Sequence, residues 1–108
     1  MQQLLPTERM LARHVITADG VMGMSVVSVR DDGTVCVEAF EHETPNTIWN
    51  NSSIALLQPE ALTEFLLDDI ERMMSHGDTL DRIHAYLNAS SLLAVAGDRA
   101  VALSFSEL

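Results

Sequence analysis

Three side chains of this chain could provide acid–base or nucleophilic chemistry: Asp69, His84 and Cys36. Asp69 follows Leu62 by seven residues, so a helix would place it in line with an apolar stripe. Burial there would raise the pKa of its carboxyl unless an arginine or hydrogen bonds compensate. His84 falls on the apolar stripe of a second predicted helix. If the two helices pack together it would approach Asp69, and the pair would form the orienting half of a catalytic relay.

A non-catalytic interpretation accounts for the same three residues and is the one that the sequence favours. Asp69 would be a paired carboxylate at the edge of the buried face, and His84 an amphipathic residue at the edge of the core. Cys36, the candidate nucleophile, lies within a predicted strand, with no helix N-terminus or adjacent cation to lower the pKa of its thiol. Catalytic roles for these residues are therefore the weaker hypothesis.

Metal and cofactor chemistry have little support in the sequence. The histidines are scattered without the spacing of common metal-binding motifs; they are His14, His42, His76 and His84. The densest cluster of possible ligands, residues 41–43 (Glu-His-Glu), is interpreted as solvated charge. No glycine-rich nucleotide loop is present, and the absence of lysine removes Schiff-base chemistry. We therefore predict no metal site and no cofactor.

Two consecutive helices are expected to carry Asp69 and His84, at about residues 59–76 and 79–88. Pro59 suits the first helical position because its φ is fixed and it lacks an N–H group. In the first helix, apolar residues recur at steps of three and four: Leu62, Phe65, Leu66, Ile70, Met73 and Met74. Gly77 is a left-handed cap, and Asp78 can cap the second helix.

Residues 24–40, MSVVSVRDDGTVCVEAF, predict a β-hairpin whose register follows from the residues. A two-residue loop would place valines opposite Cys36 and Glu38, which mixes apolar and charged side chains on each face. A three-residue loop at 31–33 instead pairs valine with valine, and Gly33 stands where such loops need a positive φ. The resulting pairs are Val29 with Val35 and Val27 with Val37.

The remaining strands complete a single domain, residues 1–108. Residues 13–17 are predicted to turn at residues 18–20 into a strand over 21–30, and residues 47–49 and 53–57 form a short meander. A closing hairpin joins residues 91–96 to 99–105 through Gly97 and Asp98. The predicted fold class is α+β, with a mostly antiparallel sheet of five to seven strands, the two helices and the closing hairpin.

Charge and cysteine content limit the classes of function. Sixteen acidic residues against six arginines give a formal net charge of −10, which repels nucleic-acid backbones and anionic lipids. We therefore expect neither nucleic-acid nor membrane binding. The single cysteine excludes an internal disulfide and fits a reducing compartment. Because no leader or membrane-spanning stretch is evident, a cytoplasmic location is the expectation.

The second face of the predicted hairpin is apolar at one end. With the paired valines facing inward, Met24, Val26 and Phe40 lie on the opposite face, and Met22 lies close by. Either the closing hairpin or another protomer could cover this end, and the sequence does not choose between them. Met22, Met24, Val26 and Phe40 are the candidate interaction residues.

Two segments, HVITADG at residues 14–20 and VVSVRDDGTV at residues 26–35, resemble the opening strands of metal-dependent amidohydrolases. In that family such strands form a small β-sandwich beside the catalytic barrel. The metal-binding His-x-His of the family is absent here, and a barrel cannot fit into the remaining residues. The resemblance thus implies a β-rich module and carries over no hydrolase activity, metal or catalytic residue.

Two functions follow from the sequence. The leading hypothesis is a non-enzymatic protein-interaction or accessory module that binds a protein partner or forms a homodimer. The alternative is a small hydrolase-like or ligand-binding enzyme built around Asp69 and His84. Hydrogen-bond contact between Asp69 and His84 beside an open pocket would favour the alternative.

Overall fold

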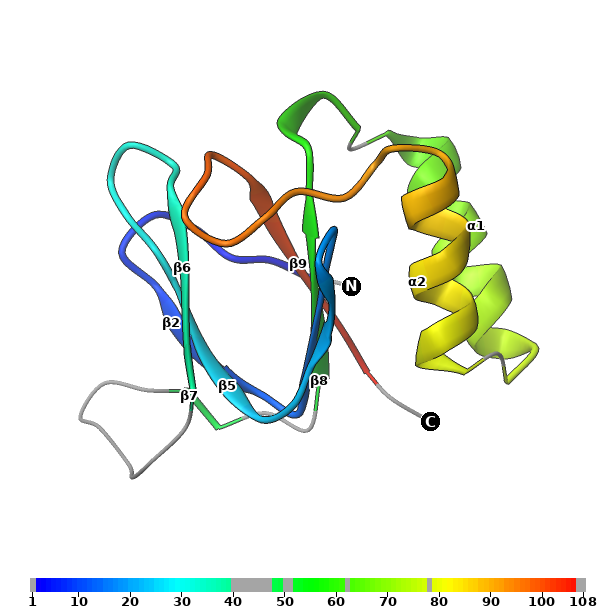
Figure 1. Ribbon diagram of the computed structural model, residues 1–108, viewed down its shortest axis with the longest axis horizontal. Coiled ribbons are helices and arrows are strands. Elements are labelled where there is room, and N and C mark those ends of the chain that lie inside the picture. Colours follow the sequence, from blue (N-terminus) through cyan, green and yellow to red (C-terminus); the bar gives the residue numbers. More distant parts are fainter. Residues whose placement is uncertain (1, 40–47, 50–51, 62, 78, 107–108) are drawn as a thin grey trace.

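The computed structural model describes residues 2–39, 48–49, 52–61, 63–77 and 79–106 and contains three layers (Figure 1). A four-stranded sheet forms one outer layer, a five-stranded sheet lies in the middle, and two helices pack on the far side of the five-stranded sheet. This arrangement confirms the predicted α+β class with mostly antiparallel strands and two helices.

The strands divide between the two sheets. The five-stranded sheet has the order β1-β9-β8-β3-β4 and the four-stranded sheet the order β6-β5-β2-β7. Their bounds are β1 Gln2–Gln3, β2 Arg9–Ala12, β3 His14–Thr17, β4 Gly20–Met22, β5 Ser25–Val29, β6 Val35–Ala39, β7 Ile48–Trp49, β8 Ser52–Leu57 and β9 Val101–Ser106. Only the β2–β7 and β3–β8 pairs are parallel among the described strands.

The register of the β5–β6 hairpin agrees with the sequence prediction. Val27 pairs with Val37 and Val29 with Val35. The loop is closed by a bond of 2.8 Å from the Arg30 N–H to the Thr34 carbonyl and one of 3.0 Å from the Gly33 N–H to the Arg30 carbonyl. Gly33 has φ 88°, a conformation that a residue without Cβ adopts at little cost. Turn chemistry and apolar pattern therefore select one register.

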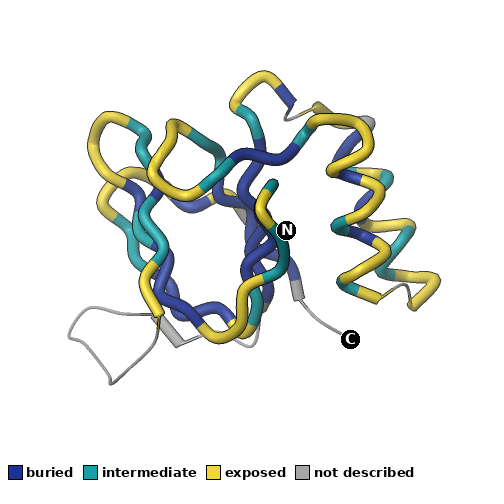
Figure 2. Tube along the Cα trace, in the orientation of Figure 1, coloured by how far each residue is buried: buried dark blue, intermediate teal, exposed yellow. Residues whose placement is uncertain are grey.

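Two buried clusters hold the three layers together (Figure 2). The hairpin valines pack in the cluster between the two sheets, together with Ile54 and Leu56 from β8. The other face of the five-stranded sheet packs against the helices; this cluster includes Ile16, Leu57, Ile70, Ile83, Leu87 and Phe105. Because both faces of the middle sheet are covered, successive residues 53–57 of β8 are all buried.

The strand predicted over residues 21–30 is interrupted. The predicted turn after residues 13–17 does form, and Thr17 pairs with Gly20. At Gly23 and Met24, however, the chain leaves β4 in one sheet and enters β5 in the other. A local sequence pattern does not show this crossing, because both strands have the apolar residues expected of a sheet.

The predicted short meander is also corrected. Both expected strands exist, as β7 and β8, but β7 pairs in parallel with β2 whereas β8 lies between β3 and β9. The chain therefore passes from one sheet to the other between them. The residues predicted as a loop at 41–46 lie outside the described residues.

Both helices begin later in the chain than the sequence pattern indicates. Residues Pro59–Ala61 form a 3₁₀ turn, and α1 spans Glu64–Ser75. Its N-cap is Thr63, whose hydroxyl accepts the Leu66 N–H at 3.2 Å. Helix α2 spans Leu80–Ala89, and the Thr79 hydroxyl caps it by accepting the Arg82 N–H at 3.3 Å. The predicted cap Asp78 and the apolar Leu62 lie outside the described residues.

The predicted closing hairpin does not form. Residues 91–96 contain no strand, and Leu93 makes only an isolated bridge to Leu57. The Ala94 N–H bonds to the Leu56 carbonyl at 2.8 Å and the Gly97 N–H to the Val35 carbonyl at 2.8 Å. The backbone groups of this segment therefore form hydrogen bonds with β8 and β6, while β9 pairs with β8 and β1.

Candidate functional site

The candidate relay of Asp69 and His84 is not assembled. The Asp69 carboxylate accepts a hydrogen bond of 2.7 Å from the Tyr86 hydroxyl and lies 3.6 Å from the Arg72 guanidinium. His84 Nε2 lies 3.0 Å from the carbonyl oxygen of Thr17, in β3. The two side chains thus have separate partners. The Tyr86–Asp69 hydrogen bond joins α1 to α2, and the His84 contact joins α2 to the five-stranded sheet.

Cys36 belongs to a different layer from these two residues. It lies in β6, opposite Ser28 of β5, and is half-buried. The five-stranded sheet stands between its sheet and the helices (Figure 1). The three catalytic candidates therefore do not converge on one site. Among the residues that the structure describes, no group of three or more His, Cys, Asp or Glu side chains could hold a metal ion.

The Tyr86–Asp69 hydrogen bond gives a pH prediction. Donation to the Asp69 carboxylate is the main factor that raises the pKa of Tyr86 above the usual 10.0, because it stabilises the neutral phenol. A raised pKa makes the bond contribute to stability below about pH 10, the pKa of unfolded tyrosine. This contribution is lost as the pH rises through the higher folded pKa.

Tyr86 is the only tyrosine in the chain, so tyrosinate absorbance reports this group alone. In the folded protein we expect a titration midpoint above that of the unfolded chain in denaturant. Asp69→Ala should bring the folded midpoint down towards the unfolded one, whereas Asp68→Ala, a change at an exposed position of the same helix, should leave it raised. Equal midpoints in wild type and Asp69→Ala would show that the hydrogen bond does not persist in solution.

The candidate interaction residues have different environments. Met22 and Met24 are exposed, by 38% and 47%. Val26, by contrast, is buried within the chain and is only 6% exposed. It pairs with Leu11 on one side and Glu38 on the other, and Leu11 is buried as well. Phe40 lies outside the described residues.

An open strand edge lies near Met24, which precedes the partner of Ala39 in the β5–β6 ladder. Strand β6 ends the four-stranded sheet (Figure 1). In an antiparallel ladder, successive residues direct their backbone groups alternately to one side and the other. Arg30 and Thr34 are joined by a hydrogen bond, so Cys36 and Glu38 bond inward to β5 while Val35, Val37 and Ala39 point outward.

Only the first of these outward positions is paired. The Val35 N–H donates to the Asp98 carbonyl at 3.1 Å, and the Val35 carbonyl accepts the Gly97 N–H. Within the described part of the chain, no hydrogen bond covers the outward groups of Val37 and Ala39. Ala39 is exposed and pairs with Ser25, which directly follows Met24.

The sequence analysis did not identify this edge, although the loop length already indicated which residues of the strand direct their backbone groups outward. The three-residue loop makes Arg30 and Thr34 the first hydrogen-bonded pair of the hairpin, and every second residue after Thr34 then bonds to β5. What the pattern could not show is that, among the described residues, only residues 97–98 bond to the other side of β6, at Val35.

A search of known protein families, of curated proteins and of solved structures found no match to this chain. The similarity of residues 14–35 to the amidohydrolase segment accordingly stays a prediction from the sequence. Among the described residues, no helix has the length and apolar character needed to cross a bilayer.

Proposed function

We propose that this protein is a non-enzymatic interaction module that pairs the open edge of β6 with an extended strand of a protein partner. The observation that carries the proposal is the outward backbone of Val37 and Ala39, which no described residue pairs. Unpaired N–H and C=O groups on an edge strand form a template for another strand, and peptide-recognition domains use this mode of binding.

Exposed Met24 supports the same surface. It immediately precedes Ser25, the partner of Ala39 in the β5–β6 ladder. Its flexible thioether side chain can adapt to apolar side chains of an incoming strand. Backbone hydrogen bonds would supply affinity along β6, and Met24 would supply apolar contact at one end.

The charge of the chain favours a partner of a different kind over a second copy. Two copies would each bring a formal net charge of −10, whereas a basic partner would be attracted. A two-fold antiparallel pair that joins Val37 to Ala39 would be centred on Glu38 and would place two like charges opposite each other, which is destabilising. A heterologous protein partner is therefore the first proposal and a homodimer the second. Because Asp69 and His84 have separate partners, we do not propose a catalytic relay.

Replacement of Ala39 by proline is the sharpest test of the edge. Proline removes the outward N–H group but no bond of the β5–β6 ladder, and it is tolerated on an edge strand at such positions. We expect thermal unfolding to change little, while retention of the partner falls about tenfold, the effect of losing roughly 1.4 kcal/mol of binding free energy. The measurement is affinity capture from cells of the source organism, quantified by mass spectrometry.

The matched control is Ala39→Val, which keeps the N–H group and has a higher β propensity. It should retain the partner as the wild type does. Sedimentation of the wild type detects a homodimer, because a homodimer would have twice the mass of one chain. Such a dimer would dissociate in Ala39→Pro. Identical capture by wild type and Ala39→Pro, together with the mass of one chain, would contradict the proposal.

A further inference from the structure

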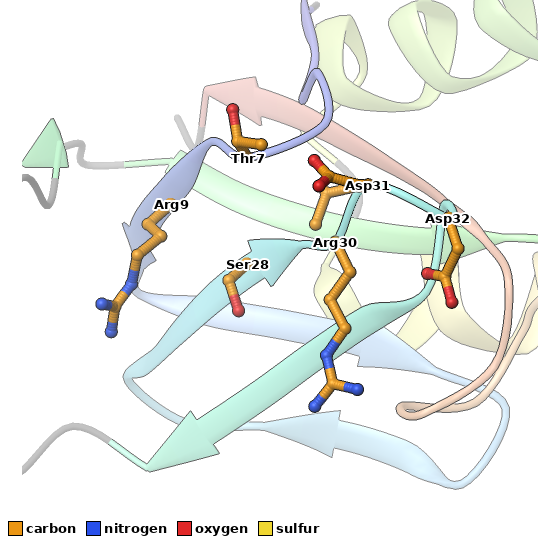
Figure 3. A pocket seen from close by; sticks show the side chains of 7 residues that line it. Thr7, Arg9, Ser28, Arg30, Asp31 and Asp32 are labelled. Carbon is orange, nitrogen blue, oxygen red and sulfur yellow. The ribbon is translucent and has the colours of Figure 1, made fainter.

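Two arginines flank an open hollow of about 550 Å³ on the outer face of the four-stranded sheet, the face opposite the core valines (Figure 3). The residues lining it are Thr7, Arg9, Ser28, Val29, Arg30, Asp31 and Asp32. Arg9 pairs with Ser28 across the β2–β5 ladder, and Arg30 follows Ser28 by two residues on the same face. In Figure 3 the Arg9 and Arg30 side chains extend on either side of Ser28.

Arg9 carries a hydrogen-bond donor without a partner. Its Nε atom is buried and makes no hydrogen bond. A buried, unpaired donor costs free energy, so the Arg9 guanidinium is held on this face without its full set of hydrogen bonds. Although the chain has sixteen acidic residues, neither Arg9 nor Arg30 forms an ion pair within the described residues, in contrast to Arg72 and Asp69.

The two aspartates at the hollow restrict the charge of a ligand. The Asp31 carboxylate lies towards Thr7 and away from the guanidinium groups (Figure 3). The Asp32 carboxylate accepts the Thr34 N–H at 2.9 Å, which is the main factor that lowers the pKa of Asp32, and the charge of Arg30 lowers it further. Two nearby negative charges disfavour a dianion such as phosphate. A monoanion with two planar oxygens fits the guanidinium groups better.

We propose that Arg9, Ser28 and Arg30 bind a carboxylate group, with guanidinium donors on both sides and the Ser28 hydroxyl between them. The ligand would bond to the terminal guanidinium nitrogens of the two arginines, because the buried Arg9 Nε atom is closed to a ligand in the hollow. This site is independent of the β6 edge, because none of its bonds involves the outward backbone groups of Val37 or Ala39. Its ligand is either a free small carboxylate or the carboxylate at the end of a peptide chain.

The side-chain Nε–H signals of arginine in ¹H–¹⁵N NMR spectra test the site directly. The chain gives at most six such signals, and Arg9→Gln identifies the one from Arg9. The probes are acetate, N-acetylglycine and its uncharged amide, with sodium chloride as the control for ionic strength. We expect the Arg9 signal to shift saturably with both carboxylates and not with the amide or chloride. Equal saturation by the two carboxylates indicates a free small acid, and preference for N-acetylglycine indicates a chain terminus.

Arg30→Gln should weaken the carboxylate response of the Arg9 signal about tenfold, because a charge-assisted bond is lost. Arg13→Gln, at an exposed position outside the hollow, should leave it unchanged. The proposal is overturned if chloride or the amide shifts the signal equally, if Arg30→Gln responds as the wild type does, or if inorganic phosphate binds more tightly than acetate. Ala39→Pro should respond like the wild type, so this test and that of the strand edge can fail separately.

Discussion

Leu56→Ala should lower the free energy of unfolding by about 2–5 kcal/mol, the range measured for truncating a fully buried leucine. Leu56 is 0% exposed and lies in the cluster between the two sheets. Its strand, β8, is flanked by β3 and β9, so the backbone on both sides is held by ladder hydrogen bonds. Such a site cannot collapse easily around the missing atoms, and most of the cavity should remain.

The loss is large because a domain of this size is stabilised by only about 5–15 kcal/mol in total. Chemical denaturation followed by circular dichroism would measure it. The control is the same substitution at Leu5, which is 61% exposed. Its backbone N–H bond to the Glu8 carboxylate does not depend on the side chain, so Leu5→Ala should change the stability by no more than about 0.5 kcal/mol. Equal effects of the two substitutions would show that the two sheets do not enclose a common core.

Local features of the fold could be predicted from the sequence. The β5–β6 register was available because alternation and loop chemistry act over adjacent residues and selected the same pairs, Val27 with Val37 and Val29 with Val35. The two helices could be predicted for the same reason, although the residues at which they begin could not. Proline at position 59 opens only a 3₁₀ turn, and the cap that begins α1 is Thr63.

Non-local pairing could not be predicted. An apolar run such as residues 91–96 carries the pattern of a strand but does not show which backbone it will meet. The glycine-first pair Gly97-Asp98 predicted a hairpin, yet Gly97 and Asp98 themselves bond to Val35 of β6, while Ala94 on one side and β9 on the other bond to β8. The division into two sheets is of the same kind. Periodicity shows that a face is buried, and only the folded chain shows what buries it.

The partners of the candidate catalytic residues could not be predicted either. Helical periodicity placed Asp69 and His84 on apolar stripes, but the direction of each side chain depends on the packed neighbours. Asp69 bonds to Tyr86 and His84 to the Thr17 carbonyl, and neither contact has a signal in the sequence. The hollow between Arg9 and Arg30 was missed as well, because its residues come together only when β2 pairs with β5.

Val27→Asp and Ser28→Asp place the same charge on adjacent residues and should have opposite outcomes. Val27 is 0% exposed and faces the core between the sheets, where an aspartate has no partner. Folding would require raising the carboxyl pKa by up to about 3–5 units, at 1.36 kcal/mol for each unit. Together with about 1.5–3 kcal/mol of lost apolar burial, this cost takes most of the stability of a small domain.

We therefore expect Val27→Asp to be largely unfolded at neutral pH, as judged by circular dichroism and NMR dispersion. Because the folded pKa would be raised, the destabilisation should develop as the pH rises above about 4, the pKa of an unfolded aspartate, and be smaller in acid. Ser28→Asp should stay folded, since its side chain lies on the outer face between Arg9 and Arg30. A folded Val27→Asp beside an unfolded Ser28→Asp would mean that β5 presents its other face to the core, which would remove both the valine core and the arginine-lined hollow.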